Sequence, residues 1–188
     1  MDDSLFAAIN GLAGHHAMID DICVLASSAG PYLLIGALAL LWFWPGARSH
    51  RDRRQGDVMI ALLSAAVALI LNQVIIHLWN RPRPFVMHAA TLLLPPSPDP
   101  SFPSDHASFG LAIAMALILS SRRIGLPALL FAAFLAFSRV YTGEHYVSDV
   151  VAGALIGSTV TCMLHLAKPY LISALAPVVR WARRWHLA

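Results

Sequence analysis

Long apolar runs constrain the fold of this chain more than any other feature of its sequence. A helix that crosses the hydrocarbon core of a bilayer needs about 20 mostly apolar residues. Four runs meet this requirement well, and a fifth ends in tryptophan residues that suit the membrane–water interface. In chain order, the five runs cover residues 30–45, 57–79, 106–120, 124–141 and 147–167. We therefore predict an all-α, polytopic transmembrane helix bundle.

The two ends of the chain leave the number of spans at five or six. Residues 4–27 are apolar but interrupted by glycine, histidine and aspartate, so they predict either a sixth, broken span or a pair of short interfacial helices. Residues 168–186 combine basic residues with tryptophan, which is typical of an amphipathic tail on an anionic leaflet and also of a solvated tail. Residues 1–188 suit one domain and are too few for two. The acidic start, which lacks a basic n-region, predicts no cleaved signal peptide.

Charge is scarce, and its distribution favours a membrane. Only 12% of the residues are charged, whereas soluble domains usually carry about 25%. The net charge of +3 is compatible with a nucleic-acid partner, but the basic residues lie in short segments between the apolar runs, as they do in membrane proteins. We expect the lipid bilayer as a partner and no nucleic acid. No residue pattern specifies an oligomeric state.

The same basic residues predict the orientation in the membrane. If the predicted spans are followed in order, the arginines of residues 46–56 and 122–123 and the basic tail 168–186 all fall on one face. The positive-inside rule makes that face cytoplasmic. Segments 80–105 and 141–147 fall on the opposite face and hold almost every polar residue suited to chemistry. The chemistry is therefore predicted to lie outside the cytoplasm.

The first chemical cluster follows the run 57–79. Pro82 and Pro84 stop the helix and keep the chain extended, so Arg81 and Arg83 are held at the membrane surface in a restrained geometry. Guanidinium forks match the oxygens of a phosphate group. Interfacial arginines that snorkel to lipid headgroups explain this pair equally well when it is taken alone.

The second cluster lies at the start of the run 106–120. Ser104 is a suitable N-cap for a helix that begins near His106. The first turn of a helix exposes unpaired N–H groups and the positive end of the dipole, which together bind anions. His106 then stands beside the bound anion. The alternative is an ordinary capped transmembrane helix that carries a surface histidine.

The third cluster joins the last two runs. Arg139 lies at the end of one span, and Gly143 permits a tight turn. His145 and Asp149 are four residues apart at the start of the next helix and share a face, so Asp149 can accept a hydrogen bond from one ring nitrogen of His145. The other nitrogen then points outward as a nucleophile. A purely structural pairing of this aspartate with its i−4 neighbour is the alternative, but ionisable groups near a span are usually functional.

Together the three clusters predict a phosphoryl-transfer site. Arginines, a helix N-terminus, two histidines and an aspartate supply the positioning and charge stabilisation on which such catalysis depends. No acidic and histidine residues recur at metal-ligand spacing, so no metal is required. A serine nucleophile is less attractive, because the sequence has no Gly-x-Ser-x-Gly elbow.

These clusters, in this order, resemble the type 2 phosphatidic acid phosphatase superfamily. Its pattern is Lys-x6-Arg-Pro, then Pro-Ser-Gly-His, then Ser-Arg-x5-His-x3-Asp. The matching stretches here are Arg83-Pro84, Pro103 to His106, and Ser138 to Asp149, of which the third is complete. The resemblance spans residues 70–160, which would form the catalytic core.

The resemblance also implies a role for each matching residue. His145 attacks phosphorus and becomes a phosphohistidine, while Asp149 orients and polarises it. His106 protonates the leaving oxygen and can later activate water. No metal or other cofactor takes part. The phosphate oxygens are held by the side chains of Arg83, Ser104 and Arg139 and by the backbone N–H of Asp105.

Two residues depart from the family pattern. Ile76 stands where the family has lysine, so Arg81 or His77 replaces that cation or the cation is absent. Asp105 replaces glycine, and its carboxylate repels a phosphate unless it faces away. Glu144, the residue before the proposed nucleophile His145, either raises the pKa of that histidine or binds a positive group.

Both departures resemble the bacitracin-resistance branch, the undecaprenyl-diphosphate phosphatases, with Arg-Pro-Arg-Pro-Phe, Pro-Ser-Asp-His and a similar opening at residues 10–14. This resemblance implies hydrolysis of undecaprenyl diphosphate at the outer face of a bacterial inner (cytoplasmic) membrane. That reaction recycles the lipid carrier for cell-wall synthesis and gives bacitracin resistance. The alternatives are a phosphatase for phosphatidylglycerophosphate, phosphatidic acid or lipid A, and a non-catalytic lipid carrier.

Overall fold

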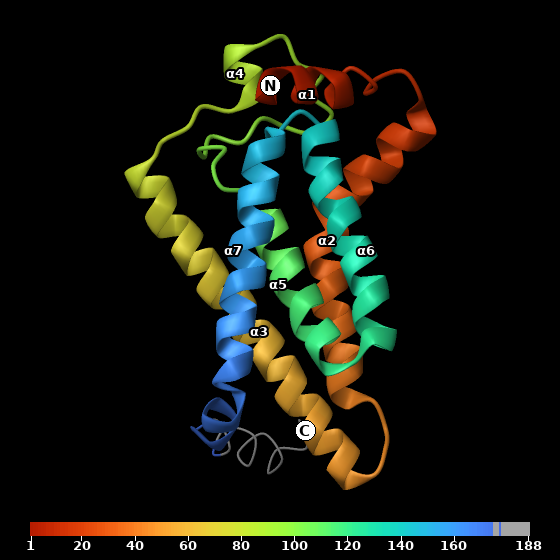
Figure 1. Cartoon of the computed structure of the whole chain (residues 1–188). Helices are drawn as coiled ribbons and strands as arrows, with labels where there is room; N and C mark the ends of the chain where they lie inside the picture. Colours follow the sequence, from red (N-terminus) through yellow and green to blue (C-terminus); the bar gives the residue numbers. More distant parts are fainter. Residues whose placement is uncertain (175–176, 178–188) are drawn as a thin grey trace.

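The computed structural model describes residues 1–174 and 177, and regular structure in this part of the chain is helical throughout. Five long helices run lengthwise through the molecule, and two short ones lie at one end of it (Figure 1). The all-α prediction is confirmed. In chain order the helices are α1 (Asp2–Asn10), α2 (Ala17–Phe43), α3 (Arg48–Leu78), α4 (Pro84–Met87), α5 (Asp105–Ser120), α6 (Arg122–Tyr141) and α7 (Val147–Leu166).

Four of the long helices, α2, α3, α6 and α7, are long and apolar enough to cross a membrane. The fifth, α5, has 16 residues and would reach only about 24 Å at 1.5 Å per residue. It packs against α3, α6 and α7 in the middle of the bundle, and most of its side chains are buried against them. A short apolar helix is sufficient there because protein surrounds it. The bundle thus has five lengthwise helices, within the predicted range.

The N-terminal segment forms neither a sixth span nor a pair of short interfacial helices, because its second part extends the helix that contains the predicted run 30–45. Residues 2–10 form α1, which lies across one end of the bundle, and residues from 17 onward belong to the first span, α2. Gly14 makes the turn between them in the left-handed region, at a φ of 83°. The side-chain amide of Asn10 fastens this end, because its Nδ2 donates hydrogen bonds to the carbonyl oxygens of Thr91 and Tyr141, each at 2.9 Å.

The two ends of the bundle differ as the charge pattern predicts. The connections at residues 44–47 and 121 and the end of α7 lie at one end, and residues 80–104 and 142–146 lie at the other (Figure 1). Lys168 pairs with Asp57 at the first end. The predicted tail 168–186 lies largely outside the described residues, including Arg180, Arg183, Arg184, Trp181 and Trp185.

Glycine brings α7 into close contact with α5. A Cβ atom at Gly157 would lie 2.2 Å from the carbonyl oxygen of Ser108, and one at Gly153 would lie 2.5 Å from that of Ser104. Small residues allow helix backbones to approach in a membrane, where there is no hydrophobic force between helices. This contact sets the start of α7 beside the start of α5, which is where the second and third chemical clusters meet.

We expect Gly157→Ala to lower the stability of the protein, because the added methyl group meets backbone atoms rather than a flexible side chain. Overpacking of this kind costs about 1–3 kcal/mol. The measurement is the thermal unfolding midpoint in detergent. Gly36→Ala is the matched control, since nothing lies within 4 Å of a Cβ at Gly36. Equal midpoints for the two variants would contradict the close-packing account.

Candidate active site

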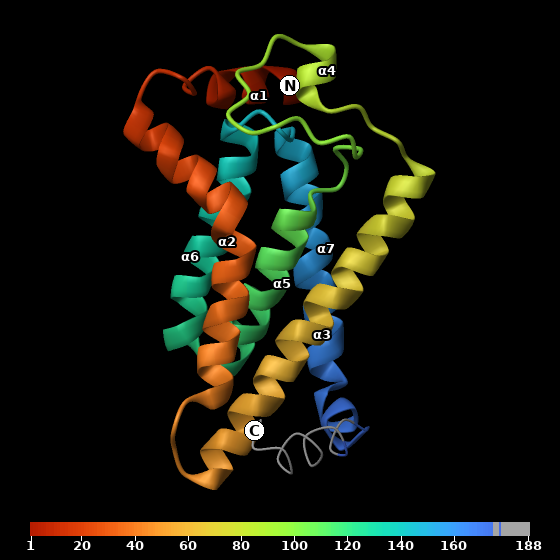
Figure 2. The ribbon, with the colours of Figure 1, turned by 180° about the vertical axis from the view of Figure 1, so that it is seen from behind.

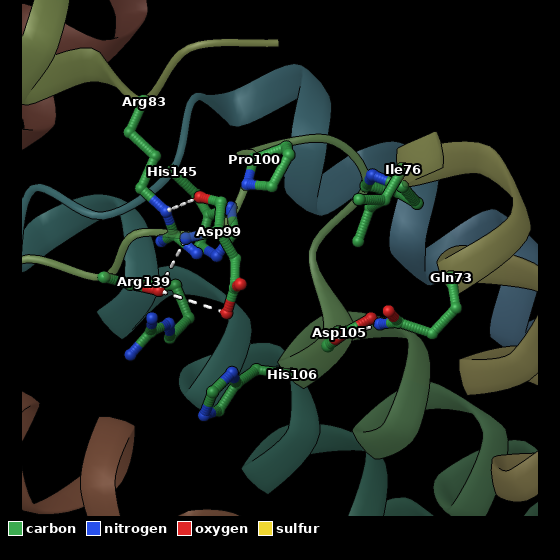
Figure 3. A pocket seen from close by; sticks show the side chains of 11 residues that line it. Gln73, Ile76, Arg83, Asp99, Pro100, Asp105, His106, Arg139 and His145 are labelled. Atoms are coloured by element: carbon green, nitrogen blue, oxygen red, sulfur yellow. Dashed lines mark hydrogen bonds between the residues drawn. The ribbon is translucent and has the colours of Figure 1, made fainter. Parts of the chain in front are cut away.

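A cavity of about 210 Å³ opens at the end of the bundle that carries the predicted chemistry. Figure 3 shows Arg83, Arg139, His106 and His145 on one side of it and the α3 residues Gln73 and Ile76 on the other. Of the eight predicted site residues, five line it. The complete lining is Gln73, Ile76, Arg83, Ser97, Asp99, Pro100, Pro103, Asp105, His106, Arg139 and His145.

His145 is oriented by a backbone carbonyl. Its Nδ1 lies 2.8 Å from the carbonyl oxygen of Ser101. A carbonyl oxygen only accepts, so Nδ1 carries the hydrogen and Nε2 keeps its lone pair. The predicted hydrogen bond to Asp149 is wrong, because Nδ1 and Asp149 Oδ2 are 3.7 Å apart. Ser101 was missed because a backbone acceptor leaves no residue-type signal in a sequence.

The surroundings of His145 keep the ring neutral. The side chain is 4% exposed. Burial lowers the pKa of His145 well below 6.5, and the nearby positive charges of Arg139 and Arg83 lower it further. A neutral imidazole with a free Nε2 is the form that can attack phosphorus.

Asp149 shapes the backbone that carries His145. Its Oδ2 accepts a hydrogen bond from the backbone N–H of Tyr146 at 2.9 Å, which caps α7. Its Oδ1 accepts one from Arg81 Nη1 at 2.6 Å. The side chain is fully buried, so a nearby cation compensates its charge.

Arg81 does not line the cavity, which corrects its prediction as a substrate-binding residue. Its guanidinium spans Asp149 and Asp2, with Nη2 2.7 Å from Asp2 Oδ2, and its Cζ lies 4.1 Å from the centre of the Tyr146 ring. The Arg81 guanidinium is therefore engaged by two carboxylates and an aromatic ring. It supports the site through Asp149 and does not line the cavity. The same contacts fasten α1 to the start of α7.

Arg83 and Arg139 meet at a shared carboxylate. Arg83 Nη1 donates to Glu144 Oε2 at 2.5 Å, and Arg139 Nη2 lies 3.4 Å from the same oxygen. Arg83 Nε is held by the carbonyl oxygen of Asp99 at 2.7 Å, and Arg139 Nη1 by Ser27 Oγ at 3.1 Å. Of the two alternatives for Glu144, the structure shows the contact with positive groups.

The start of α5 contributes a buried hydroxyl. Ser104 is the N-cap residue, but its side chain makes no capping hydrogen bond. Its Oγ is buried and, among the described residues, has no hydrogen-bond partner. This hydroxyl is next to the lining residues Pro103 and Asp105 without lining the cavity itself. It keeps its hydrogen-bonding capacity for a ligand at the N-terminus of α5.

Asp105 faces the helix α3 rather than the two arginines. Its Oδ1 accepts from Asn72 Nδ2 at 2.7 Å, and its Oδ2 accepts from Gln73 Nε2 at 3.3 Å. Asn72 Nδ2 also lies 2.9 Å from Ser108 Oγ, which ties α3 to α5. These two amides were missed because they lie inside a long apolar run. Ile76, on the same helix, lines the cavity and adds no positive charge.

An apolar groove adjoins the cavity. It has a volume of about 280 Å³ and shares Asp105 and His106 with the first cavity. Figure 2 shows α2 and α3 diverging toward this end of the molecule, with α5 between them. The rest of the groove comes from these three helices: Pro31, Tyr32, Ile35, Leu69 and Phe109.

This arrangement suits a ligand with an anionic head and an apolar tail. The head would meet two guanidiniums and a helix N-terminus, and the tail would enter the groove from the bilayer. Among residues 1–174 and 177, no group of three or more His, Cys, Asp or Glu is placed to hold a metal ion. The fold and the site define an integral membrane lipid phosphatase.

The chain belongs to the PAP2 superfamily, whose family profile matches residues 57–173. It is 32% identical over 156 residues to undecaprenyl-diphosphatase BcrC of Bacillus subtilis, which covers 83% of this chain and 78% of the relative. It is 32% identical over 148 residues to an undecaprenyl-diphosphatase of Sulfolobus acidocaldarius, covering 77% and 68%. Among solved structures, Aquifex aeolicus LpxE matches with a TM-score of 0.72 and 26% identity, over 85% of this chain and 92% of that one.

Proposed function

We propose that this protein hydrolyses undecaprenyl diphosphate, or a closely similar polyprenyl diphosphate, to the monophosphate and inorganic phosphate. One observation supports the proposal: a cavity with a neutral histidine and two guanidiniums lies next to an apolar groove that shares Asp105 and His106 with it. The two undecaprenyl-diphosphatases to which the chain is similar support the choice of lipid. All of residues 1–188 belong to this one catalytic unit in the proposal, with residues 70–160 as its core.

In the proposed mechanism, His145 Nε2 attacks the terminal phosphorus and the bond to the bridging oxygen breaks. Arg83, Arg139 and Ser104, with the backbone N–H of Asp105, hold the phosphoryl oxygens. His106, protonated when the negative charge of the substrate is bound beside it, gives a proton to the lipid phosphate as it leaves. The neutral His106 then takes a proton from the water that attacks the phosphohistidine, and the P–N bond breaks to release inorganic phosphate and free His145. The carbonyl oxygen of Ser101 keeps the proton on Nδ1 of the nucleophile during the first step.

The proposed location is a bacterial cytoplasmic membrane, with the site on the outer face. The basic connections lie at the end of the bundle opposite the cavity, which supports this orientation through the positive-inside rule. A diphosphate released outside the cell would reach the cavity without crossing the bilayer. Its hydrolysis would recycle the lipid carrier and contribute to bacitracin resistance.

Phosphate release from a panel of lipids tests the substrate. Purified protein with EDTA would receive undecaprenyl diphosphate, farnesyl diphosphate, phosphatidylglycerophosphate, phosphatidic acid and lipid A. We expect fastest release from the polyprenyl diphosphates, undiminished by EDTA. Faster release from a glycerolipid or lipid A would refute the choice of substrate. Binding of these lipids without any release would favour a non-catalytic carrier.

The groove gives a prediction about chain length. Ile35→Trp would fill part of the groove, so we expect it to raise KM for undecaprenyl diphosphate by about tenfold, while KM for a short-chain diphosphate stays within about twofold. Steady-state kinetics on both substrates measure this difference. Leu155→Trp is the control, because Leu155 is 63% exposed on α7 and away from the groove. Equal effects of the two variants on the long substrate would exclude the groove as the tail site.

A further inference from the structure

The carboxylate of Glu144 lies where the two arginines of the site meet. Its side chain is 2% exposed, and one oxygen, Oε2, contacts Arg83 Nη1 at 2.5 Å and Arg139 Nη2 at 3.4 Å. The other oxygen, Oε1, is buried without a hydrogen-bond partner among the described residues. Glu144 is thus bound through one oxygen to the two guanidiniums that the proposed mechanism assigns to phosphate.

A phosphate group and this carboxylate require the same donors. Guanidinium forks bind carboxylate and phosphate oxygens in the same manner. Two anions on the same pair of cations also repel each other, and burial strengthens this repulsion because little water screens it. A phosphate that enters the site must therefore displace the Glu144 carboxylate from at least one arginine or bind beside it at a cost.

Arg83 has other hydrogen-bond partners that hold its guanidinium if the Glu144 carboxylate moves. Arg83 Nη1 also donates to the main-chain carbonyl oxygen of Glu144 at 3.1 Å, and Arg83 Nε is held by Asp99. These contacts keep Arg83 in place when the Glu144 side chain turns away. Of the two carboxylates that line the cavity, Asp105 is held by the amides of Asn72 and Gln73 on α3, and Asp99 accepts a hydrogen bond from Ser97 Oγ at 3.5 Å.

We propose that Glu144 is an internal competitor for the phosphate-binding arginines, which weakens the binding of free inorganic phosphate and so speeds its release after hydrolysis. The inference deepens the proposed function, because it concerns regulation of the same anion site. A diphosphate lipid retains its affinity through its tail in the groove. Orthophosphate has no tail, so nothing compensates for the affinity that it loses through competition with Glu144.

Direct binding tests the inference without any turnover. Orthophosphate and orthovanadate would be titrated calorimetrically into the purified wild type, Glu144→Gln and Glu144→Asp. We expect Glu144→Gln to bind both anions about tenfold more tightly, which corresponds to about 1.4 kcal/mol. Glu144→Asp keeps the charge but is one methylene shorter, so we expect a smaller tightening. Asp21→Asn removes an exposed carboxylate outside the cavity and should bind within about twofold of wild type.

Unchanged or weaker anion binding in Glu144→Gln would overturn the inference, as would an absence of binding in every variant. If Glu144→Gln does not fold, Glu144→Asp decides by the same criterion. Tightening of equal size in Asp21→Asn would also overturn it, because the effect would then be one of general charge. Hydrolysis of undecaprenyl diphosphate by the wild type is measured in parallel. Its failure would refute the proposed function and leave the binding comparison valid.

Discussion

His145→Ala is expected to lower kcat for hydrolysis of a polyprenyl diphosphate by about 10⁴-fold or more, because it removes the proposed nucleophilic nitrogen. The ring is buried beside Arg83 and Arg139, with Nε2 as its free nitrogen. KM should change far less than kcat, since the arginines and the groove still bind the substrate. Phosphate release at saturating substrate, with detergent and lipid held constant, measures the loss.

The control for this variant is His15→Ala, which removes an exposed histidine in the connection between α1 and α2, outside the cavity lining. It should retain activity within about twofold of wild type, as surface substitutions usually do. A His145→Ala protein that keeps its thermal unfolding midpoint and more than a tenth of the wild-type kcat would contradict a nucleophilic role. His106, the proposed general acid, would then need to be tested as the nucleophile.

Arg139→Ala should produce the second largest effect, a fall in kcat/KM of about 10³-fold. Arg139 is held by Ser27 and shares Glu144 with Arg83, so its guanidinium is fixed before substrate binds. A preorganised donor that stabilises charge in the transition state contributes about 10²–10³-fold in rate, and the lost binding charge adds to this. Initial rates at low substrate concentration measure kcat/KM directly.

Arg139→Lys separates the charge of this residue from its shape. Lysine keeps the positive charge but loses the planar fork, so it should recover about tenfold of the activity lost in Arg139→Ala. Arg123→Ala, which removes an exposed arginine in the first turn of α6 and outside the cavity lining, should leave kcat/KM unchanged. Full activity in Arg139→Lys would show that only the charge of this residue matters. Full activity in Arg139→Ala would show that Arg139 does not contribute to the site.

Much of the fold could be predicted because a membrane span leaves a strong local signal. The starts and ends of α5, α6 and α7 lie within two residues of the predicted runs 106–120, 124–141 and 147–167. The structure of residues 4–27 was harder to predict, because the same apolar residues suit a span or an interfacial helix. Its division at Gly14 depends on contacts that Asn10 makes with residues far along the chain.

The candidate site was predictable where it depends on residue type and local spacing. Arg83, His106, Arg139 and His145 line one cavity. The close packing of α5 and α7 at Gly153 and Gly157 brings together the starts of these two helices, beside which His106 and His145 lie. The partners of these side chains were not predictable in the same way. The carbonyl oxygen that orients His145 belongs to Ser101, 44 residues away, and depends on the path of the loop before α5.

The position of Arg81 could not be predicted from residue type either. It stands two residues from Arg83 in an identical Arg-Pro context, so the sequence gives both arginines the same role. In the structure, Arg83 lines the cavity and Arg81 contacts Asp2 and Asp149. An evenly extended chain would place residues i and i+2 on the same face, so the divergence depends on the local path of the backbone, which the residue types alone do not specify.

If a histidine of this chain carries the phosphoryl group during hydrolysis, rapid-quench trapping should isolate the phosphorylated protein. Undecaprenyl diphosphate labelled with ³²P at the terminal phosphate would be mixed with excess enzyme and quenched in alkali within one turnover. We expect a labelled protein that is stable to alkali and labile to acid, with the label on His145 and no label on the His145→Ala variant. Labelled inorganic phosphate formed at the full rate with no labelled protein at any time, or a label on another residue, would contradict it.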